Sequence, residues 1–261
     1  LWTFLLWKAW RDEAPTHAPP VDADKTCTFV FVSREAVLGA TGCLPQYGRL
    51  PERQLKTAAL DFSQVVLGAY RHEFLAVSHR WERPEQPDPD GVQRAKIQAH
   101  LRAHARIQWV WYDYTCLPQG ERTSQEKRDF QRMLAAVNML SLGCSVLLIV
   151  DSSSRFWTQF EAWLAMQTCA ANGLATADGD VRRWTLECVL GAQQQFEGDK
   201  LETMWRRAKA DFAHKVLSRN DVTVTIRGWR GGGAGGSCRV RCRSGRGRRL
   251  LFARRDGGHR R

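Results

Sequence analysis

The sequence predicts a doubly wound α/β domain with a mainly parallel sheet of five strands. Short apolar runs and amphipathic stretches alternate five times over about 155 residues, from 72 to 226. One run, Ser145–Val150, is apolar at every position after the first, which is typical of a parallel strand covered on both faces. The 261 residues are 43% hydrophobic and 25% charged, which excludes collagen-like, coiled-coil and fully disordered proteins.

The elements of this domain follow from periodicity, taken in order. The predicted strands are Phe74–Ser78, Trp109–Asp113, Ser145–Val150, Trp184–Val189 and Asp221–Ile226. Apolar residues at helical spacing predict helices through Ile97 to Ala105, Phe130 to Leu140, Trp157 to Leu164 and Leu201 to Phe212. The second helix is expected to begin at Thr123, because Thr123-x-x-Glu126 has the spacing of a capping box.

Two stretches precede this domain. Residues 1–25 combine an apolar segment, Leu1–Trp10, with a linker. Ten residues are about half of what a bilayer span needs, so we favour a docking segment without membrane association over the alternative, the end of a membrane helix. Residues 26–71 are expected to form an extension packed on the domain of residues 72–226, with a strand at Thr28–Val32. Spacings of 4, 3, 4 and 4 predict one helix in the extension, with a stripe of Leu55, Ala59, Phe62, Val66 and Tyr70.

The net charge of +12 lies almost entirely in residues 227–261. This tail has 12 arginines, one acidic residue and 10 of the 21 glycines, a composition that favours disorder. We interpret it either as translated non-coding sequence or as an arm that binds RNA or phosphate. Residues 1–226 carry a net charge of only +1, so we expect no specific nucleic-acid binding by the core. The eight cysteines are scattered through apolar patterns, which favours an intracellular, cytoplasmic location.

Polar residues with catalytic or binding chemistry follow three of the predicted strands. In an open parallel sheet, ligands bind outside the carboxyl ends of the strands, so these residues are expected to line one edge. The three segments are Ser78-His79-Arg80-Trp81-Glu82, Asp113-Tyr114-Thr115-Cys116 and Asp151-Ser152-Ser153-Ser154-Arg155. Ser152–Ser154 are also explained as helix caps.

Glu161 is the first candidate for a catalytic group. It shares a helical stripe with Trp157, Phe160 and Leu164, so its carboxylate is expected on a face that otherwise packs against the core. Such a carboxylate is costly unless it is paired or functional. The alternative is a capping box, Thr158-x-x-Glu161, in which the carboxylate is only a structural cap.

Three blocks of this sequence resemble the fungal heterokaryon-incompatibility (HET) domain and, more remotely, the Toll/interleukin receptor (TIR) domain. Residues 74–81 (FLAVSHRW) resemble the opening strand of the HET domain. Residues 111–119 (WYDYTCLPQ) resemble its block W-x-D-x-x-C-I-N-Q, with Leu117-Pro118 in place of Ile-Asn. Residues 155–161 (RFWTQFE) resemble R-x-W-T-x-x-E, and Trp157-x-x-x-Glu161 has the spacing of the TIR catalytic helix. The chain is also similar to uncharacterised algal and protist HET-like proteins. The resemblance implies a flavodoxin-like (TIR-like) fold.

The resemblance to TIR domains also implies an activity. It makes Glu161 the catalytic carboxylate of an NAD glycohydrolase, which cleaves the nicotinamide–ribose bond, with NAD as substrate and no resident cofactor. Trp157 is then mainly a packing residue. Positions at the strand ends suggest the other roles: Arg80 and Arg155 for the pyrophosphate, Trp81 or Tyr114 for stacking on a base, and Ser78 or Asp113 for orienting a ribose. Residues 1–226 have no G-x-G-x-x-G motif, and the sequence has no P-loop motif and no recognisable set of metal ligands.

Two other functions remain open at this point. HET and TIR domains act by assembling with copies of themselves or with related domains, so the second hypothesis is a non-catalytic adaptor in recognition, innate immunity or cell-death signalling. The loop Thr115–Arg122 takes the place of the TIR loop that makes such contacts. The third hypothesis is a thiol hydrolase with Cys116 as nucleophile and His79 as its base, since both follow adjacent strands.

Overall fold

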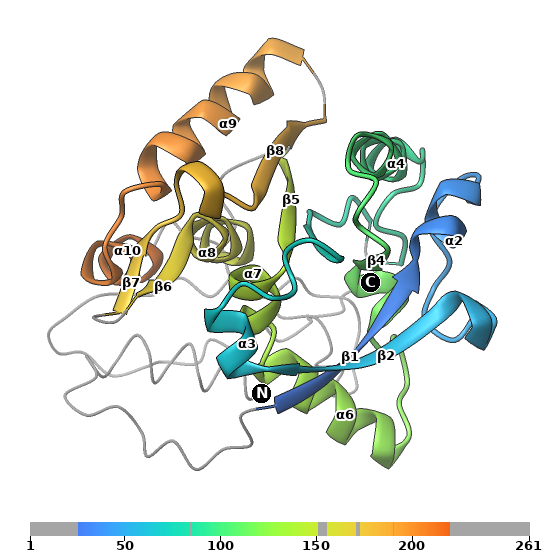
Figure 1. Cartoon of the computed structure of the whole chain (residues 1–261). Helices are drawn as coiled ribbons and strands as arrows, with labels where there is room; N and C mark the ends of the chain where they lie inside the picture. Colours follow the sequence, from blue (N-terminus) through green and yellow to red (C-terminus); the bar gives the residue numbers. More distant parts are fainter. Residues whose placement is uncertain (1–25, 84, 151–155, 171–172, 190, 220–261) are drawn as a thin grey trace, which may run out of the picture.

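A six-stranded, mostly parallel sheet organises the fold (Figure 1). The computed structural model describes residues 26–219 except 84, 151–155, 171, 172 and 190. The strand order is β2-β1-β4-β3-β5-β8. Four adjacent strands are parallel to one another: β4 (Trp109–Trp111), β3 (Phe74–Ser78), β5 (Ser145–Val150) and β8 (Trp184–Cys188). The predicted α/β class is therefore confirmed, with β3 and β5 at their predicted bounds.

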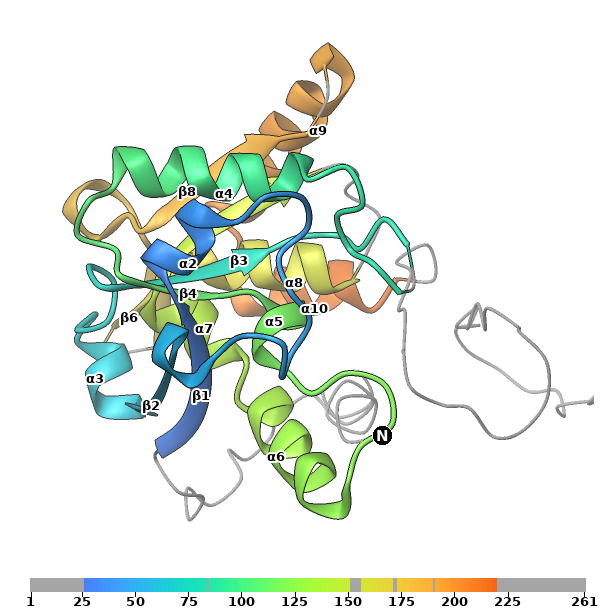
Figure 2. The same ribbon diagram turned by 90° about the vertical axis from the view of Figure 1, so that its right-hand side faces the viewer.

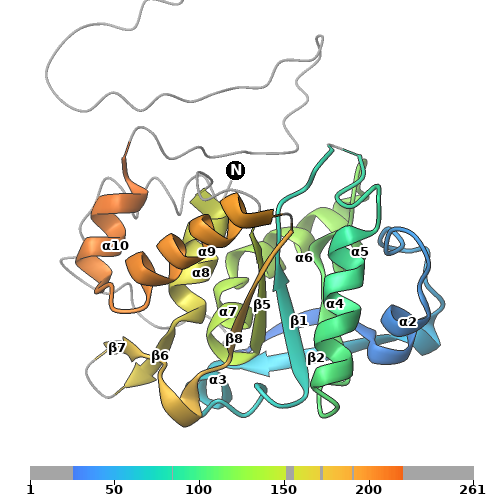
Figure 3. The same ribbon diagram turned by 90° about the horizontal axis from the view of Figure 1, so that it is seen from above.

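Helices cover both faces of this sheet. The helix α4 (Val92–Ala103) lies with α2 (Arg34–Gly39) on one face, whereas α8 (Phe156–Ala165) and α9 (Gly191–Trp205) lie on the other (Figures 1 and 3). All five residues of β3 are buried, as are five of the six in β5. The apolar composition of these two strands is thus explained by helices on both sides.

The sheet extends beyond the predicted domain on the side of β4. Two strands come from the extension: β1 (Thr26–Ser33) is antiparallel both to β4 and to β2 (Leu55–Asp61). The predicted strand Asp221–Ile226 lies outside the described residues, as do Leu1–Trp10 and the tail 227–261. The extension of residues 26–71 therefore continues the sheet of the domain.

The single helix predicted over residues 55–70 is wrong. Its first half is the strand β2, and only the short helix α3 (Phe62–Val66) follows. Seven residues of β2 pair with β1, and this pairing overrides a helical spacing of apolar residues. Asp61 ends the strand and caps α3, because its carboxylate accepts hydrogen bonds from the backbone amides of Ser63 and Gln64.

Two other predicted helices are each divided in two. The first comprises α6 (Ser124–Ala135) and α7 (Asn138–Gly143), and the second comprises α9 and α10 (Ala210–Leu217). The capping box at the start of α6 is confirmed: Thr123 Oγ1 accepts from Glu126 N at 3.2 Å, and Glu126 Oε2 accepts from Thr123 N at 2.8 Å.

Five smaller elements complete the described chain. They are the short helix α5 (Asp113–Cys116), the hairpin of β6 (Gln167–Ala170) and β7 (Gly173–Thr176), which the sequence did not predict, and the 3-10 turns Glu52–Gln54 and Gly179–Val181. Within the described residues, every helix is too short or too polar to span a bilayer.

Candidate functional site

The carboxyl ends of β3 and β4 bring two of the predicted polar segments together. The strands β3 and β4 pair in parallel, so Ser78 and His79 emerge beside the start of α5 (Asp113–Cys116), which follows β4. Figure 2 shows the loop after β3 extending from this edge of the sheet before it returns to α4. The predicted convergence of these segments is thus confirmed. The third segment, Asp151–Arg155, lies outside the described residues, and Arg155 with it.

Glu161 reaches the same edge from α8. Its carboxylate oxygen Oε2 accepts a hydrogen bond from Ser78 Oγ at 2.6 Å. Ser78 is buried and Glu161 is half-buried. Desolvation raises the pKa of Glu161 to about 7, and nearby Asp113 adds to the rise, whereas the Ser78 hydroxyl and the charge of His79 oppose it. Glu161 is therefore a carboxyl group that can exchange a proton near neutral pH.

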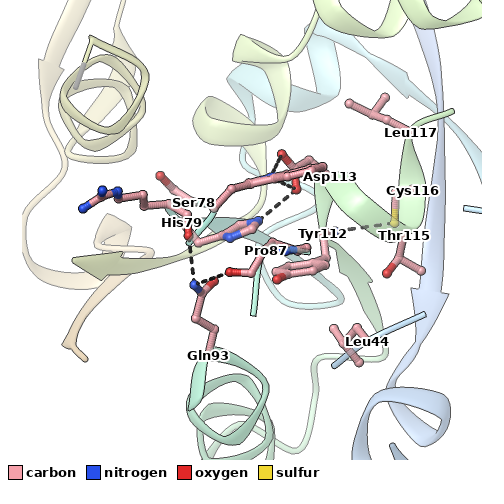
Figure 4. A network of polar contacts seen from close by, with 12 residues as sticks. Leu44, Ser78, His79, Pro87, Gln93, Tyr112, Asp113, Thr115, Cys116 and Leu117 are labelled. Atoms are coloured by element: carbon pink, nitrogen blue, oxygen red, sulfur yellow. Dashed lines mark hydrogen bonds and ion pairs between the residues drawn. The ribbon is translucent and has the colours of Figure 1, made fainter. Parts of the chain in front are cut away.

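Asp113 fixes two residues of the loop after β3. His79 Nε2 lies 2.9 Å from Asp113 Oδ1, and Trp81 Nε1 donates to both carboxylate oxygens, at 2.8 Å to Oδ2 and 3.1 Å to Oδ1 (Figure 4 draws His79 with Asp113). Both oxygens of Asp113 are thus engaged with side chains of the protein. This arrangement gives Asp113 the role of holding the loop, in place of the predicted contact with a ribose.

His79 is the most enclosed of these polar groups. Its side chain is 2% exposed and stacks on the ring of Tyr112, with ring centres 4.2 Å apart. Burial by itself lowers the pKa of His79, but Asp113, Glu161 and Gln93 raise it above the ordinary value. The sequence placed His79 at this edge only as a base for Cys116, and the structure gives it a different partner.

The aromatic and arginine candidates lie around this network. Trp81 packs edge-on against Tyr114 with ring centres 5.3 Å apart, and both side chains are half-buried. Trp157 packs edge-on against Phe156 at 5.2 Å, in agreement with a packing role. Arg80 is half-buried, and its carbonyl oxygen accepts from Gln93 Nε2 at 2.8 Å.

The environment of α8 confirms one expectation about Glu161 and corrects another. Leu164 is buried and the half-buried Trp157 and Phe160 pack against the core, so Glu161, itself half-buried, shares a core-facing stripe as predicted. The capping box Thr158-x-x-Glu161 is wrong, because α8 already begins at Phe156 and Thr158 lies inside it. The Glu161 carboxylate contacts the Ser78 side chain instead.

Gln93 is a site residue that the sequence analysis missed. It lies in the first turn of α4 and ties down the loop after β3, because its Nε2 donates to the carbonyl oxygens of Arg80 at 2.8 Å and Pro87 at 3.1 Å. Asp88 caps the same turn by accepting from the amides of Gln93 and Arg94. An aspartate before a predicted helix signals the cap, but no sequence signal distinguishes Gln93 from an ordinary helical glutamine.

The structure argues against Cys116 as a nucleophile. Its side chain is fully buried, and burial raises the pKa of the thiol to about 12, which leaves almost no thiolate at neutral pH. The Cys116 thiol contacts the backbone of Tyr112 and Val110, whereas His79 is hydrogen-bonded to Asp113. The thiol-hydrolase hypothesis therefore lacks both a thiolate and its base.

In the described part of the chain, no three or more His, Cys, Asp or Glu side chains are grouped so that they could bind a metal ion. Comparisons with protein-family models, with curated proteins and with solved structures found no match. The site is therefore interpreted from its own geometry and from the sequence motifs that converge on it.

Proposed function

We propose that this edge of the sheet hydrolyses NAD-type nucleotides at the nicotinamide–ribose bond, in a HET/TIR-like intracellular signalling domain. The observation that carries the proposal is the contact of Glu161 with Ser78, which joins two of the three HET-like blocks in one polar site. The strand order offers support. Numbered along the chain, the four parallel strands have the order 2-1-3-4, which matches the first four positions of a flavodoxin-like sheet, 2-1-3-4-5.

The chemistry suits a single carboxylate. Cleavage of the bond between nicotinamide and ribose C1′ leaves positive charge on the ribose, and nicotinamide departs neutral without needing an acid. The ionised Glu161 would stabilise this charge and then accept a proton from the attacking water. With a pKa of about 7, half of the Glu161 side chains are ionised at neutral pH. The hydrogen bond from Ser78 holds the carboxylate in place.

The remaining residues of the site would bind the nucleotide substrate. Arg80, and Arg155 by its place in the motif, would pair with the pyrophosphate. The edge-on pair of Trp81 and Tyr114 offers aromatic surface on which a base can stack. Asp113 contributes indirectly, because it holds the indole of Trp81.

A cytoplasmic location accompanies this proposal. The six cysteines in the described residues are all free thiols. Free thiols are usual in proteins of a reducing compartment.

A second candidate function is a self-associating adaptor. It is favoured by α3 and the residue after it, where Phe62 is 46%, Val66 40% and Leu67 74% exposed. Three large apolar side chains grouped on the surface are more typical of an interface than of isolated exposure. The partner on this hypothesis is a second copy of the chain or a related domain.

Nicotinamide release distinguishes the two functions. The full chain is incubated with NAD, and the wild type is compared with Glu161→Ala and with Glu52→Ala, a control at an exposed glutamate. We expect Glu161→Ala to lose at least about 100-fold in rate and Glu52→Ala to keep it. Equal rates in all three proteins would remove Glu161 from the mechanism. If the wild type releases no nicotinamide and its mass in sedimentation rises with concentration, the adaptor function is favoured.

A further inference from the structure

The imidazole of His79 lies between two acceptor groups. On one side, Nε2 is hydrogen-bonded to the Asp113 carboxylate at 2.9 Å. The other nitrogen, Nδ1, is buried and makes no hydrogen bond of normal geometry within the described residues, and the same holds for Gln93 Oε1. Figure 4 shows Asp113 and Gln93 on opposite sides of the His79 ring.

The orientation of the Gln93 amide is fixed by its other contacts. Its nitrogen donates to two carbonyl oxygens, those of Arg80 and Pro87, so a flipped amide would set oxygen against oxygen. Gln93 Oε1 is therefore the atom left to accept from His79. As a side-chain hydrogen-bond partner, Gln93 raises the pKa of His79.

An imidazole that donates to an acceptor on each side carries a proton on both nitrogens. The groups that act on the ring come from three helices and one connecting residue: Asp113 on α5, Glu161 on α8, Gln93 on α4, and Tyr112 between β4 and α5. Two of these groups are acids, Gln93 offers an acceptor, and the stacked ring of Tyr112 is neutral. Together the two acids and Gln93 raise the pKa of His79 by more than desolvation lowers it.

His79 is also linked to Glu161 through the backbone. Ser78 and His79 are consecutive residues, and the hydroxyl of Ser78 binds the Glu161 carboxylate. The position of the His79 ring is thus tied to that of the carboxylate. Of the two charged groups near Glu161, Asp113 favours its protonated form and His79 favours its ionised form.

We propose that His79 is a positioning residue: held as an imidazolium between Asp113 and Gln93, it keeps a working fraction of the Glu161 carboxylate ionised at neutral pH. The catalytic consequence rests on the proposed function, whereas the electrostatic link between His79 and Glu161 does not. In the absence of this charge, burial and Asp113 would leave Glu161 mostly protonated and unable to stabilise a cationic ribose.

Nuclear magnetic resonance tests the proposal without relying on turnover. In the wild-type chain at pH 7, the ¹⁵N shifts of His79 should show both ring nitrogens protonated, and a neutral tautomer would overturn the proposal. The titration of the Glu161 carboxyl, assigned by its loss in Glu161→Gln, should have its midpoint near 7. In His79→Gln, which keeps a donor for Asp113 but no charge, the proton affinity of Glu161 should rise about tenfold.

Matched variants complete the test. His104→Gln, at an exposed histidine that ends α4, should leave the Glu161 titration unchanged. Gln93→Leu should lower the midpoint at which His79 itself loses its proton, and an unchanged midpoint would remove Gln93 from the pair. If His79→Gln leaves the Glu161 midpoint unchanged or lowers it, the proposal fails. The pH midpoint of nicotinamide release should shift together with the titration midpoint of Glu161 in each variant. If the wild-type chain releases no nicotinamide, the proposed function is refuted, and the titration midpoints alone decide the role of His79.

Discussion

Replacing Glu161 by glutamine is expected to stabilise the folded protein at alkaline pH. The pKa of Glu161 is raised from 4.5 to about 7 in the folded state, because burial disfavours the carboxylate. Between these two values the folded chain binds more protons than the unfolded chain, so the free energy of unfolding falls as pH rises. The stabilising effect of the protonated carboxyl is thus present below pH 4.5 and is lost as pH rises towards 7.

The size of this effect follows from the two pKa values. For one group that titrates at 4.5 unfolded and about 7 folded, the free energy of unfolding decreases by about 2.5 kcal/mol between pH 5 and pH 8. His79 acts in the same direction, because its raised pKa contributes stability below pH 6.5 that is lost as pH rises through its folded value. Glu161→Gln removes the Glu161 contribution and weakens that of His79, since Glu161 raises the pKa of His79.

The assay is urea unfolding at pH 5 and pH 8, followed by tryptophan fluorescence. The free energy of unfolding of the wild type should fall by at least about 2.5 kcal/mol from pH 5 to pH 8. In Glu161→Gln this fall should be smaller by at least about 2 kcal/mol. Glu52→Gln, at an exposed position, should behave as the wild type. An equal pH dependence in the wild type and Glu161→Gln would refute the reasoning, because the Glu161 carboxyl would then titrate alike in both states.

Three further substitutions test separate parts of the structure. Asp113→Asn removes the charge that holds His79 and should cost about 2 kcal/mol in urea unfolding at pH 7, whereas Asp180→Asn, at an exposed turn, should cost almost nothing. Cys116→Ala should keep nicotinamide release within about threefold of the wild type, since the thiol is buried and protonated; a complete loss would restore the thiol mechanism. Thr123→Ala breaks the capping box of α6 and should cost about 1 kcal/mol, and no change in the unfolding midpoint would contradict it.

The central strands could be predicted from the sequence because burial on both faces leaves a clear pattern. The runs Phe74–Ser78 and Ser145–Val150 have few polar residues and end in polar loops, so both bounds are visible. The convergence of Ser78 with Asp113 then follows from parallel pairing alone. Glu161 could be placed near them because α8 follows the next strand of the same sheet.

The remaining features depend on contacts that a local pattern does not encode. The strand β2 has helical spacing, and only its pairing with β1 makes it a strand. The partners of His79 come from α4 and α5, 14 and 34 residues further along the chain, so neither Gln93 nor the role of Asp113 was visible in the motif. On α8, Leu164 is buried whereas Trp157 and Glu161 are half-buried, and this difference is set by the elements that pack around the helix, not by the spacing of the residues.

The most direct test of the proposed activity is the pH profile of nicotinamide release from NAD by the full chain. The account predicts a rate that rises between pH 5 and pH 9 with a single midpoint near 7, and a rate close to zero at every pH in Glu161→Gln. Release by Glu161→Gln at the wild-type rate, with the same midpoint, would contradict the claim that this carboxylate acts on the nucleotide.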